Sequence, residues 1–441
     1  MPGPPDVTPG LVPRAPGTPR GPASPWPRAL SAFRHRNFRL FWSGQLVSLV
    51  GTWMQQVAQG WLVLELTGDP LALGITAACQ FLPVLAFGLF GGVLADALPK
   101  RRTLVAAQAG ALALALALGI LTGSGLVQVW QVWLLAALLG LVNAIEMPVR
   151  QAFVMEMVGR EDVANAVALN SAVFNGSRIV GPALAGLLIA AAGIAVCFFV
   201  NAASYVAVMI GLLLMRDEEL RATASARFER TMRGVGGQLA EGLRYVRDTP
   251  IVRLSILLLG FVATVGMNFS VLMPVLVRVE LHGSAETYGF LLAASGVGSL
   301  AAAVGIALGM RPTPRLLVTG AGVFGAALLG VALSRSVPLT LVLMVLLGWG
   351  VIALAATTNT LIQLNVPDVL RGRVMSVYTT VFAGSTPIGG VFAGSVAAAA
   401  GVPLALGLGG LLALGAAAVA ATRLPRLAGA RGSQAAGPEP R

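Results

Sequence analysis

A single positive charge, Arg178, interrupts a long apolar run, and Pro182 follows it four positions later. If the run is helical, Pro182 cannot donate a backbone hydrogen bond, so the carbonyl of Arg178 loses its helical partner. An arginine at the centre of a membrane helix costs about 2.5–3.5 kcal/mol on insertion scales and requires a balancing group. A guanidinium beside a freed carbonyl therefore predicts a site that binds an anionic group or gates a pathway.

The stretch around Arg178 recurs later in the chain. Residues 173–186, shifted by 208 positions, fall on residues 381–394, and seven of the fourteen positions are identical. One helix face in each copy carries aromatic and polar side chains: Asn170, Phe174 and Arg178 in the first, and Tyr378, Phe382 and Thr386 in the second. We predict that both faces line a substrate cavity, although only the first carries a charge.

Small residues form a neighbouring stripe in each copy. Ser177, Gly181 and Ala185 are spaced four apart, which lets two helix backbones approach closely in lipid. Gly176, Gly181, Pro182 and Gly186 together form a glycine–proline motif on this segment.

The composition is that of a polytopic membrane protein. Of the 441 residues, 56% are hydrophobic and 11% are charged, against about 25% charged in soluble proteins. The apolar runs are about 20 residues long, as membrane helices are, and they lack the alternation of a membrane barrel. Two cysteines and two histidines provide neither a disulfide framework nor a metal pattern. We expect no metal site and no cofactor.

Twelve spans can be counted, six on each side of a charged segment. They cover about residues 38–65, 71–94, 103–122, 126–147, 165–190, 194–215, 251–277, 288–309, 316–333, 339–363, 374–399 and 402–422. The predicted domains are a disordered tail (1–32), a six-helix bundle (33–215), a cytoplasmic linker (216–250), a second six-helix bundle (251–422) and a disordered tail (423–441). In the linker, Leu239, Leu243 and Val246 predict a short amphipathic helix on the membrane surface, or alternatively a solvated linker helix.

Two further glycines support a repeat, since Gly68 and Gly74 match Gly283 and Gly289 at a shift of 215. Each half has an even number of spans, so the second half enters the membrane in the same orientation as the first. The sequence therefore predicts an all-α membrane protein with twelve transmembrane helices in two parallel six-helix repeats.

The basic residues indicate the orientation. If the N-terminus is cytoplasmic, the outer loops hold two of the 30 Lys and Arg, Arg278 and Arg335, and Arg178 lies within a span; the other 27 are cytoplasmic. Such an asymmetry is the positive-inside pattern and places both termini in the cytoplasm. It explains the formal charge of +12 without a nucleic-acid partner.

Polar side chains mark further candidate cavity residues, because unpaired polar groups are unfavourable against lipid. The longest stripe, on span 38–65, steps by three and four: Gln45, Ser48, Thr52, Gln55 and Gln59. Later spans contribute Asn268, Thr357, Asn359 and Gln363. We predict a cavity lining for the whole stripe, with interhelical hydrogen bonds as the alternative for individual residues.

The segment between the second and third spans carries a recognisable motif. It runs from Gly92 through Asp96 to a basic cluster, Lys100, Arg101 and Arg102. This resembles the loop signature of the major facilitator superfamily, although Ala97 and Pro99 replace the usual Arg and Gly. The resemblance implies that Asp96 bonds across to the other half and latches the inner gate. Glu146 and Arg150, four apart, could supply the missing part of this charge relay, whereas a plain stop-transfer cluster would explain only the basic residues.

The glycine–proline motif is similar to the helix-5 signature of the superfamily's exporters. Phe33–Phe41, Gly51–Gln55, Pro148–Phe153 and Arg371–Ser376 look like the enterobactin-exporter-like, or transmembrane secretion effector, branch. The resemblance spans residues 33–422 and implies a bacterial inner-membrane protein that exports siderophores, drugs or similar small amphipathic molecules, usually against proton entry. We expect it to act as a monomer, with lipid, substrate and protons as its partners.

A proton carrier is harder to identify, because no carboxylate shares the depth of Arg178, about 20 Å along its helix from Asn165. Glu65, near the outer end of span 38–65, is the candidate. Structurally, Arg178 could instead bond to backbone carbonyls and to Glu65.

Other functions remain as alternatives to an exporter. A nutrient importer would have the same fold, and a membrane sensor or scaffold would require a soluble output module. An enzyme is disfavoured, because the spans contain no paired carboxylates or Cys/His arrangement and the chain has no P-loop.

Overall fold

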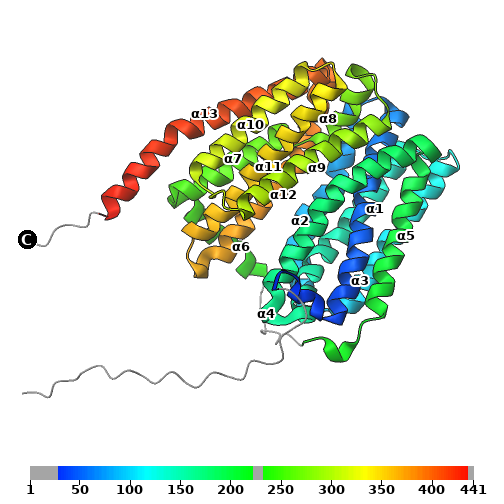
Figure 1. Cartoon of the computed structure of the whole chain (residues 1–441), viewed down its shortest axis with the longest axis horizontal. Coiled ribbons are helices and arrows are strands. Elements are labelled where there is room, and N and C mark those ends of the chain that lie inside the picture. Colours follow the sequence, from blue (N-terminus) through cyan, green and yellow to red (C-terminus); the bar gives the residue numbers. More distant parts are fainter. Residues whose placement is uncertain (1–27, 222–231, 436–441) are drawn as a thin grey trace, which may run out of the picture.

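The computed structural model describes residues 28–221 and 232–435, where every regular element is a helix (Figure 1). The elements are η1 (Arg28–Arg34), α1 (Arg36–Thr67), α2 (Pro70–Ala97), α3 (Lys100–Gly123), α4 (Val129–Ala192), α5 (Ile194–Leu213), η2 (Asp217–Glu219), α6 (Met232–Asp248), α7 (Pro250–Gly266), α8 (Phe269–Val275), η3 (Leu276–Glu280), α9 (Ala285–Ala307), α10 (Pro314–Leu333), α11 (Val337–Asn365), α12 (Asp368–Ala400) and α13 (Val402–Ala435).

The longest element, α4, contains both the fourth and the fifth predicted spans, and the residues between them, 148–164, are also helical. Its 64 residues are interrupted only at Gly159, where φ is 71° and ψ is 179°. Only glycine adopts this conformation readily, so the chain turns there within a single residue. A straight helix of that length would measure about 96 Å, far more than a bilayer, so α4 contains two membrane-crossing segments joined at Gly159.

About ten to twelve helices cross the membrane. Ten are long and apolar enough by length and composition among the described residues, with α4 counted once. The polar stripe of α1 lowers its hydropathy, although its 32 residues are long enough to span. The predicted seventh span, residues 251–277, lies within the candidate span Pro250–Glu280. It is interrupted near Met267 and Asn268, which divides it into α7, α8 and η3.

The helices pack as two groups that lie side by side (Figure 1). We call α1–α5 the first bundle, and α7–α13 with η3 the second bundle. The linker end is the end where α5 finishes and α7 begins, and the far end is the opposite one. Between the bundles, α2 packs against α12 and α4 packs against α9.

Glycines make the contacts between bundles possible toward the far end. A Cβ on Gly74 would lie 2.4 Å from the carbonyl oxygen of Gly390, and one on Gly289 would lie 2.3 Å from that of Pro182. Neither distance is tolerable for a real Cβ, so these backbones touch only because glycine has no side chain. Large apolar side chains on the outer faces, such as Leu213 and Ile120, remain exposed, as expected against lipid.

The linker helix α6 packs against the second bundle. Val246 is buried, Tyr245 donates a hydrogen bond to the Asn365 carbonyl at 2.8 Å, and Arg373 pairs with Glu241 at 2.5 Å. The linker segment is thus helical, with Val246 on its covered face and Leu243 58% exposed.

Candidate functional site

Arg178 lies beside two aromatic side chains in the first bundle. Its guanidinium carbon is 5.8 Å from the centre of the Trp53 ring on α1, within cation–π range. Phe174, one turn away, meets Trp53 edge-on with 5.8 Å between ring centres and is 47% exposed. Arg178 is partly exposed and makes no hydrogen bond or ion pair with the described side chains. A cation held by an aromatic face, next to an exposed ring, can bind an amphipathic anion.

The glycine–proline motif positions this cluster. Gly181 packs on the α1 backbone, since a Cβ there would lie 2.5 Å from the Cβ of Trp53. Gly186 packs on α9 in the same way, with 2.8 Å to the Cα of Glu286. Gly176 has open space around it. The motif therefore holds α4 between α1 and α9.

The carbonyl of Arg178, which Pro182 deprives of its helical partner, faces α9. A Cβ on Gly296 would lie 2.9 Å from this oxygen. Asn170, two turns before Arg178, is partly exposed.

The second bundle holds a matching aromatic and polar cluster. Tyr378 and Phe382 stack with parallel rings, 6.2 Å between centres, and Phe382 is 38% exposed. Asn359 lies near the Tyr378 hydroxyl and accepts a hydrogen bond of 2.5 Å from Gln363. The structure thus brings together four predicted cavity residues, while Thr386, the counterpart of Arg178, is partly buried nearby on α12.

The polar stripe of α1 is mostly covered, which corrects the prediction of a continuous cavity lining. Gln55 accepts a hydrogen bond of 2.6 Å from Asn201 of α5. The other buried members are Gln45, Ser48 and Gln59, each at most 6% exposed. Unpaired amides are costly in a membrane interior, and the packing of α1 against α5 provides the partner of Gln55. Only Thr52 is exposed, and it donates to the carbonyl of Ser48.

Two candidates on the second bundle are also buried. Asn268 is 4% exposed, donates to the Thr264 carbonyl and packs on Gly389. Thr357 is fully buried, and its hydroxyl has no partner among the described atoms. Neither faces open space in this structure.

Gln59 does line a small cavity where α1, α2 and α8 meet. Its volume is about 20 Å³, and Gln56, Thr76, Gln80 and Ser270 complete its polar lining. A space of that size holds about one water molecule.

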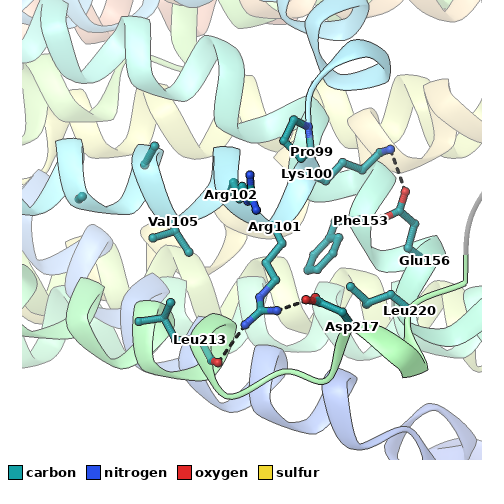
Figure 2. Close-up of a pocket in the computed structure, with 12 residues that line it drawn as sticks. Pro99, Lys100, Arg101, Arg102, Val105, Phe153, Glu156, Leu213, Asp217 and Leu220 are labelled. Atoms are coloured by element: carbon teal, nitrogen blue, oxygen red, sulfur yellow. Dashed lines mark hydrogen bonds and ion pairs between the residues drawn. The ribbon is translucent and has the colours of Figure 1, made fainter.

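The basic cluster after α2 is tied to the first bundle (Figure 2). Lys100 pairs with Glu156 of α4 at 2.8 Å, and Arg101 pairs with Asp217 at 2.5 Å. Arg101 also donates hydrogen bonds to the carbonyls of Leu212 and Leu213, at the end of α5. The negative end of the helix dipole lies there and stabilises a cation. These bonds stabilise the linker end of one bundle.

The other predicted latch residues are placed as follows. Glu146 and Arg150 form the expected pair, with 3.0 Å between Oε1 and Nε. Gly92 and Asp96 belong to α2, and the Asp96 side chain lies outside the described part of the structure. Arg102 is exposed.

Glu65 lies at the far end of α1 and is exposed. It accepts a hydrogen bond of 2.8 Å from Trp61, whose ring stacks on the buried Tyr288. No bond joins Glu65 to Arg178 among the described contacts, so the structural role suggested for that pair finds no support. The described residues contain no group of three potential metal ligands.

Comparison with known proteins identifies the family. Residues 27–441 match the family model described as "Transmembrane secretion effector". The chain belongs to the transmembrane secretion effector family. This family is a branch of the major facilitator superfamily, so the chain is a membrane transporter and not an enzyme.

Relatives of this secretion effector have named activities. It is 32% identical over 398 residues to the multidrug efflux pump Tap of Mycolicibacterium fortuitum, covering 87% of this chain and 94% of the relative. It is 25% identical to a staphyloferrin A transporter of Staphylococcus aureus, covering 77% and 84%. The enterobactin exporter EntS of Citrobacter koseri is 24% identical, covering 82% and 86%.

Solved structures support the fold of the secretion effector. A POT family transporter aligns with a TM-score of 0.70 at 10% identity, covering 89% of this chain and 96% of that one. A bacterial Spinster homologue in an inward-facing, unoccupied conformation aligns with a TM-score of 0.66 at 14% identity, covering 90% and 96%.

The sequence did not predict one buried charge network, which is centred on Asp162. Asp162, just after the Gly159 break, lies 2.7 Å from both His35 and Arg34 and accepts a hydrogen bond from Ser31 at 2.8 Å. Burial raises the pKa of the Asp162 carboxyl, but the hydrogen bonds from His35 and Ser31 and the charge of Arg34 outweigh it and hold the pKa below its ordinary value. The network fastens the start of α1 to α4. Its members are 127–131 positions apart, so no local pattern indicates it.

Proposed function

We propose that this transporter exports small amphipathic, anionic molecules by alternating access. The observation that carries the proposal is the environment of Arg178, which lies against Trp53 beside the exposed ring of Phe174 and pairs with no described carboxylate. A substrate carboxylate or similar anion would supply the missing partner, and its apolar part would lie on the aromatic rings. Relatives named as efflux pumps and siderophore exporters favour export.

The second cluster would form the opposite wall of the same cavity. Tyr378, Phe382, Asn359 and Gln363 offer rings and amides but no charge. An asymmetric pair of walls suits a ligand that is anionic on one side and neutral on the other.

Two parallel six-helix repeats, over residues 33–215 and 251–422, are part of the proposal. The far-end contacts support it, because they match under the shifts found in the sequence. A shift of 215 positions carries Gly74 to Gly289, and a shift of 208 carries Pro182 to Gly390. Gly74 touches the carbonyl of Gly390, and its counterpart Gly289 touches the carbonyl of Pro182. Repeats related by an axis along the membrane normal would produce such paired contacts.

The proposed orientation has both termini on the cytoplasmic side of a bacterial plasma membrane. Single cysteines at the exposed positions Gly68, Ser124 and Ser336, in a variant lacking Cys79 and Cys197, should react with an impermeant reagent in intact cells. A cysteine at Ser225, which lies outside the described residues, should stay unlabelled. The opposite labelling would reverse the orientation.

Closure of the linker end is proposed to involve Asp96, with Glu146 and Arg150 as the auxiliary pair. Proton entry is the proposed energy source. Glu65 is the candidate carrier because it is an exposed carboxylate on α1 at the far end. A monomer holds the whole proposed cavity, so no partner copy is required.

Transport assays test the proposal directly. Everted vesicles should accumulate labelled siderophores or anionic dyes when a pH gradient is imposed, and collapsing the gradient should abolish accumulation. Uptake into intact cells, with none into everted vesicles, would instead establish the importer. Absence of transport for the whole panel in both systems, with protein present in the membrane, would contradict the proposal.

A further inference from the structure

A pocket of about 740 Å³ opens at the linker end of the first bundle (Figure 2). It lies where α3 begins, beside the middle of α4, the end of α5 and η2. This position is away from the Arg178 cluster, so the pocket is separate from the proposed substrate cavity.

The ionisable lining of the pocket has a positive excess. Lys100, Arg101 and Arg102 face Glu156 and Asp217, which leaves three positive and two negative charges, or a net +1. Lys100 and Arg101 are engaged by the two acids, whereas Arg102 is exposed and has no partner among the described side chains.

Backbone groups add to this positive excess. Helix α3, with 24 residues, begins at Lys100, and its N-cap residue, Pro99, gives no side-chain cap. The first N–H groups of α3 therefore present the positive end of the helix dipole beside Arg102.

The rest of the pocket is apolar. Val105, Ala106 and Leu220 form its accessible wall over the buried Phe153, and Leu213 lies at its rim, 60% exposed. The exposed surface continues along α5 through Ile210, which is 52% exposed. An anion site that opens onto a lipid-facing surface suits a ligand with both a charge and an alkyl chain.

We propose that this pocket binds the headgroup of an anionic phospholipid from the leaflet at the linker end. The lipid phosphate takes the unpaired charge of Arg102 and the first N–H groups of α3, and the start of an acyl chain lies along Ala106 and Leu213. Inorganic phosphate would leave the apolar wall uncovered. A zwitterionic lipid would bring its own cation against Arg101 and Arg102. Basic pockets on the cytoplasmic side of membrane helices recognise headgroups in this way.

The test measures lipid binding and not transport, so it does not depend on the proposed export. The purified full-length protein in neutral detergent is titrated with phosphatidylglycerol, with phosphatidylcholine of the same chains, and with inorganic phosphate. Melting temperature and the number of retained lipids, counted by native mass spectrometry, are recorded. We expect phosphatidylglycerol alone to raise the melting temperature and to be retained.

Matched variants locate the effect. Arg102→Gln should weaken phosphatidylglycerol binding about fivefold, the value of one surface cation. Arg311→Gln, which removes an exposed cation between α9 and α10, should leave it unchanged. Ala106→Phe, which fills the pocket without altering charge, should also weaken retention. Equal protection by phosphatidylcholine or by inorganic phosphate, or equal losses in the Arg102 and Arg311 variants, would overturn the proposal.

Discussion

Replacing Arg178 by glutamine separates a substrate contact from a structural one. The structure indicates one interaction that stabilises the arginine, the cation–π contact with Trp53 at 5.8 Å, worth about 0.5–2 kcal/mol. Against this, a central arginine costs about 2.5–3.5 kcal/mol in the membrane. The glutamine variant should therefore be as stable as the parent, or more stable by about 0.5–3 kcal/mol from the difference of these terms.

Substrate affinity should move in the other direction. Loss of a charged hydrogen bond of about 1.5–3 kcal/mol weakens Kd roughly ten- to hundredfold. Arg178→Lys should keep part of the affinity, because the charge remains while the planar fork is lost. Arg278→Gln, which removes an exposed charge on η3, serves as the control and should bind normally.

Binding titrations and thermal melts of the purified variants decide the question. A lower melting temperature with unchanged Kd in Arg178→Gln would refute the reasoning, because it would make the arginine a structural residue.

Three further substitutions probe the framework around the site. Gly74→Ala places a Cβ 2.4 Å from a carbonyl across the bundles. Spin-label distances at the far end should therefore lengthen, and transport should fall about five- to hundredfold, the equivalent of about 1–3 kcal/mol of overpacking. Gly88→Ala on the same helix, with open space around it, should be neutral, and equal effects of the two variants would contradict the contact. Asp162→Asn should lower the melting temperature by a few degrees. Because folding lowers the pKa of Asp162, this difference should be full above about pH 4, the ordinary pKa, and should disappear as the pH falls through the pKa of the folded state. A difference that persists in acid would exclude the carboxylate as its source. The variants Gln55→Leu and Asn201→Leu and their combination form a double-mutant cycle, which should give a coupling energy of about 0.6 kcal/mol and at most about 1.7 kcal/mol. Zero coupling would mean that the 2.6 Å hydrogen bond between these side chains contributes nothing to stability.

The sequence was sufficient to predict an all-helical membrane protein and to propose a face for the site. Periodicity placed Phe174 and Arg178 on one side of a helix, and hydropathy located most spans. It could not find Trp53, the residue that contacts both, because nothing in the spacing of α1 says which of its faces meets α4.

Other misses have the same origin. The sequence pattern of a polar stripe such as that of α1 is the same whether water or α5 covers it. For Gln55, the hydrogen bond from the amide of Asn201 shows that α5 covers it. Likewise, the spans predicted at 126–147 and 165–190 leave the residues between them unassigned, whereas the structure joins the two spans in one helix that turns at Gly159.

The packing of α4 makes its second segment a lever. Counted from the contact of Pro182 with Gly289, the 20 residues back to Asp162 form a helical segment about 30 Å long. At that contact the two backbones touch with no side chain between them, so the contact would act as the fulcrum. A tilt of about 10° at that fulcrum would swing the Asp162 end through about 5 Å while Phe174, about 12 Å out, travels about 2 Å. A small rotation of α4 at the far end would thus produce a larger displacement at the linker end. The hydrogen bond between His35 and Asp162 would make the start of α1 move with it.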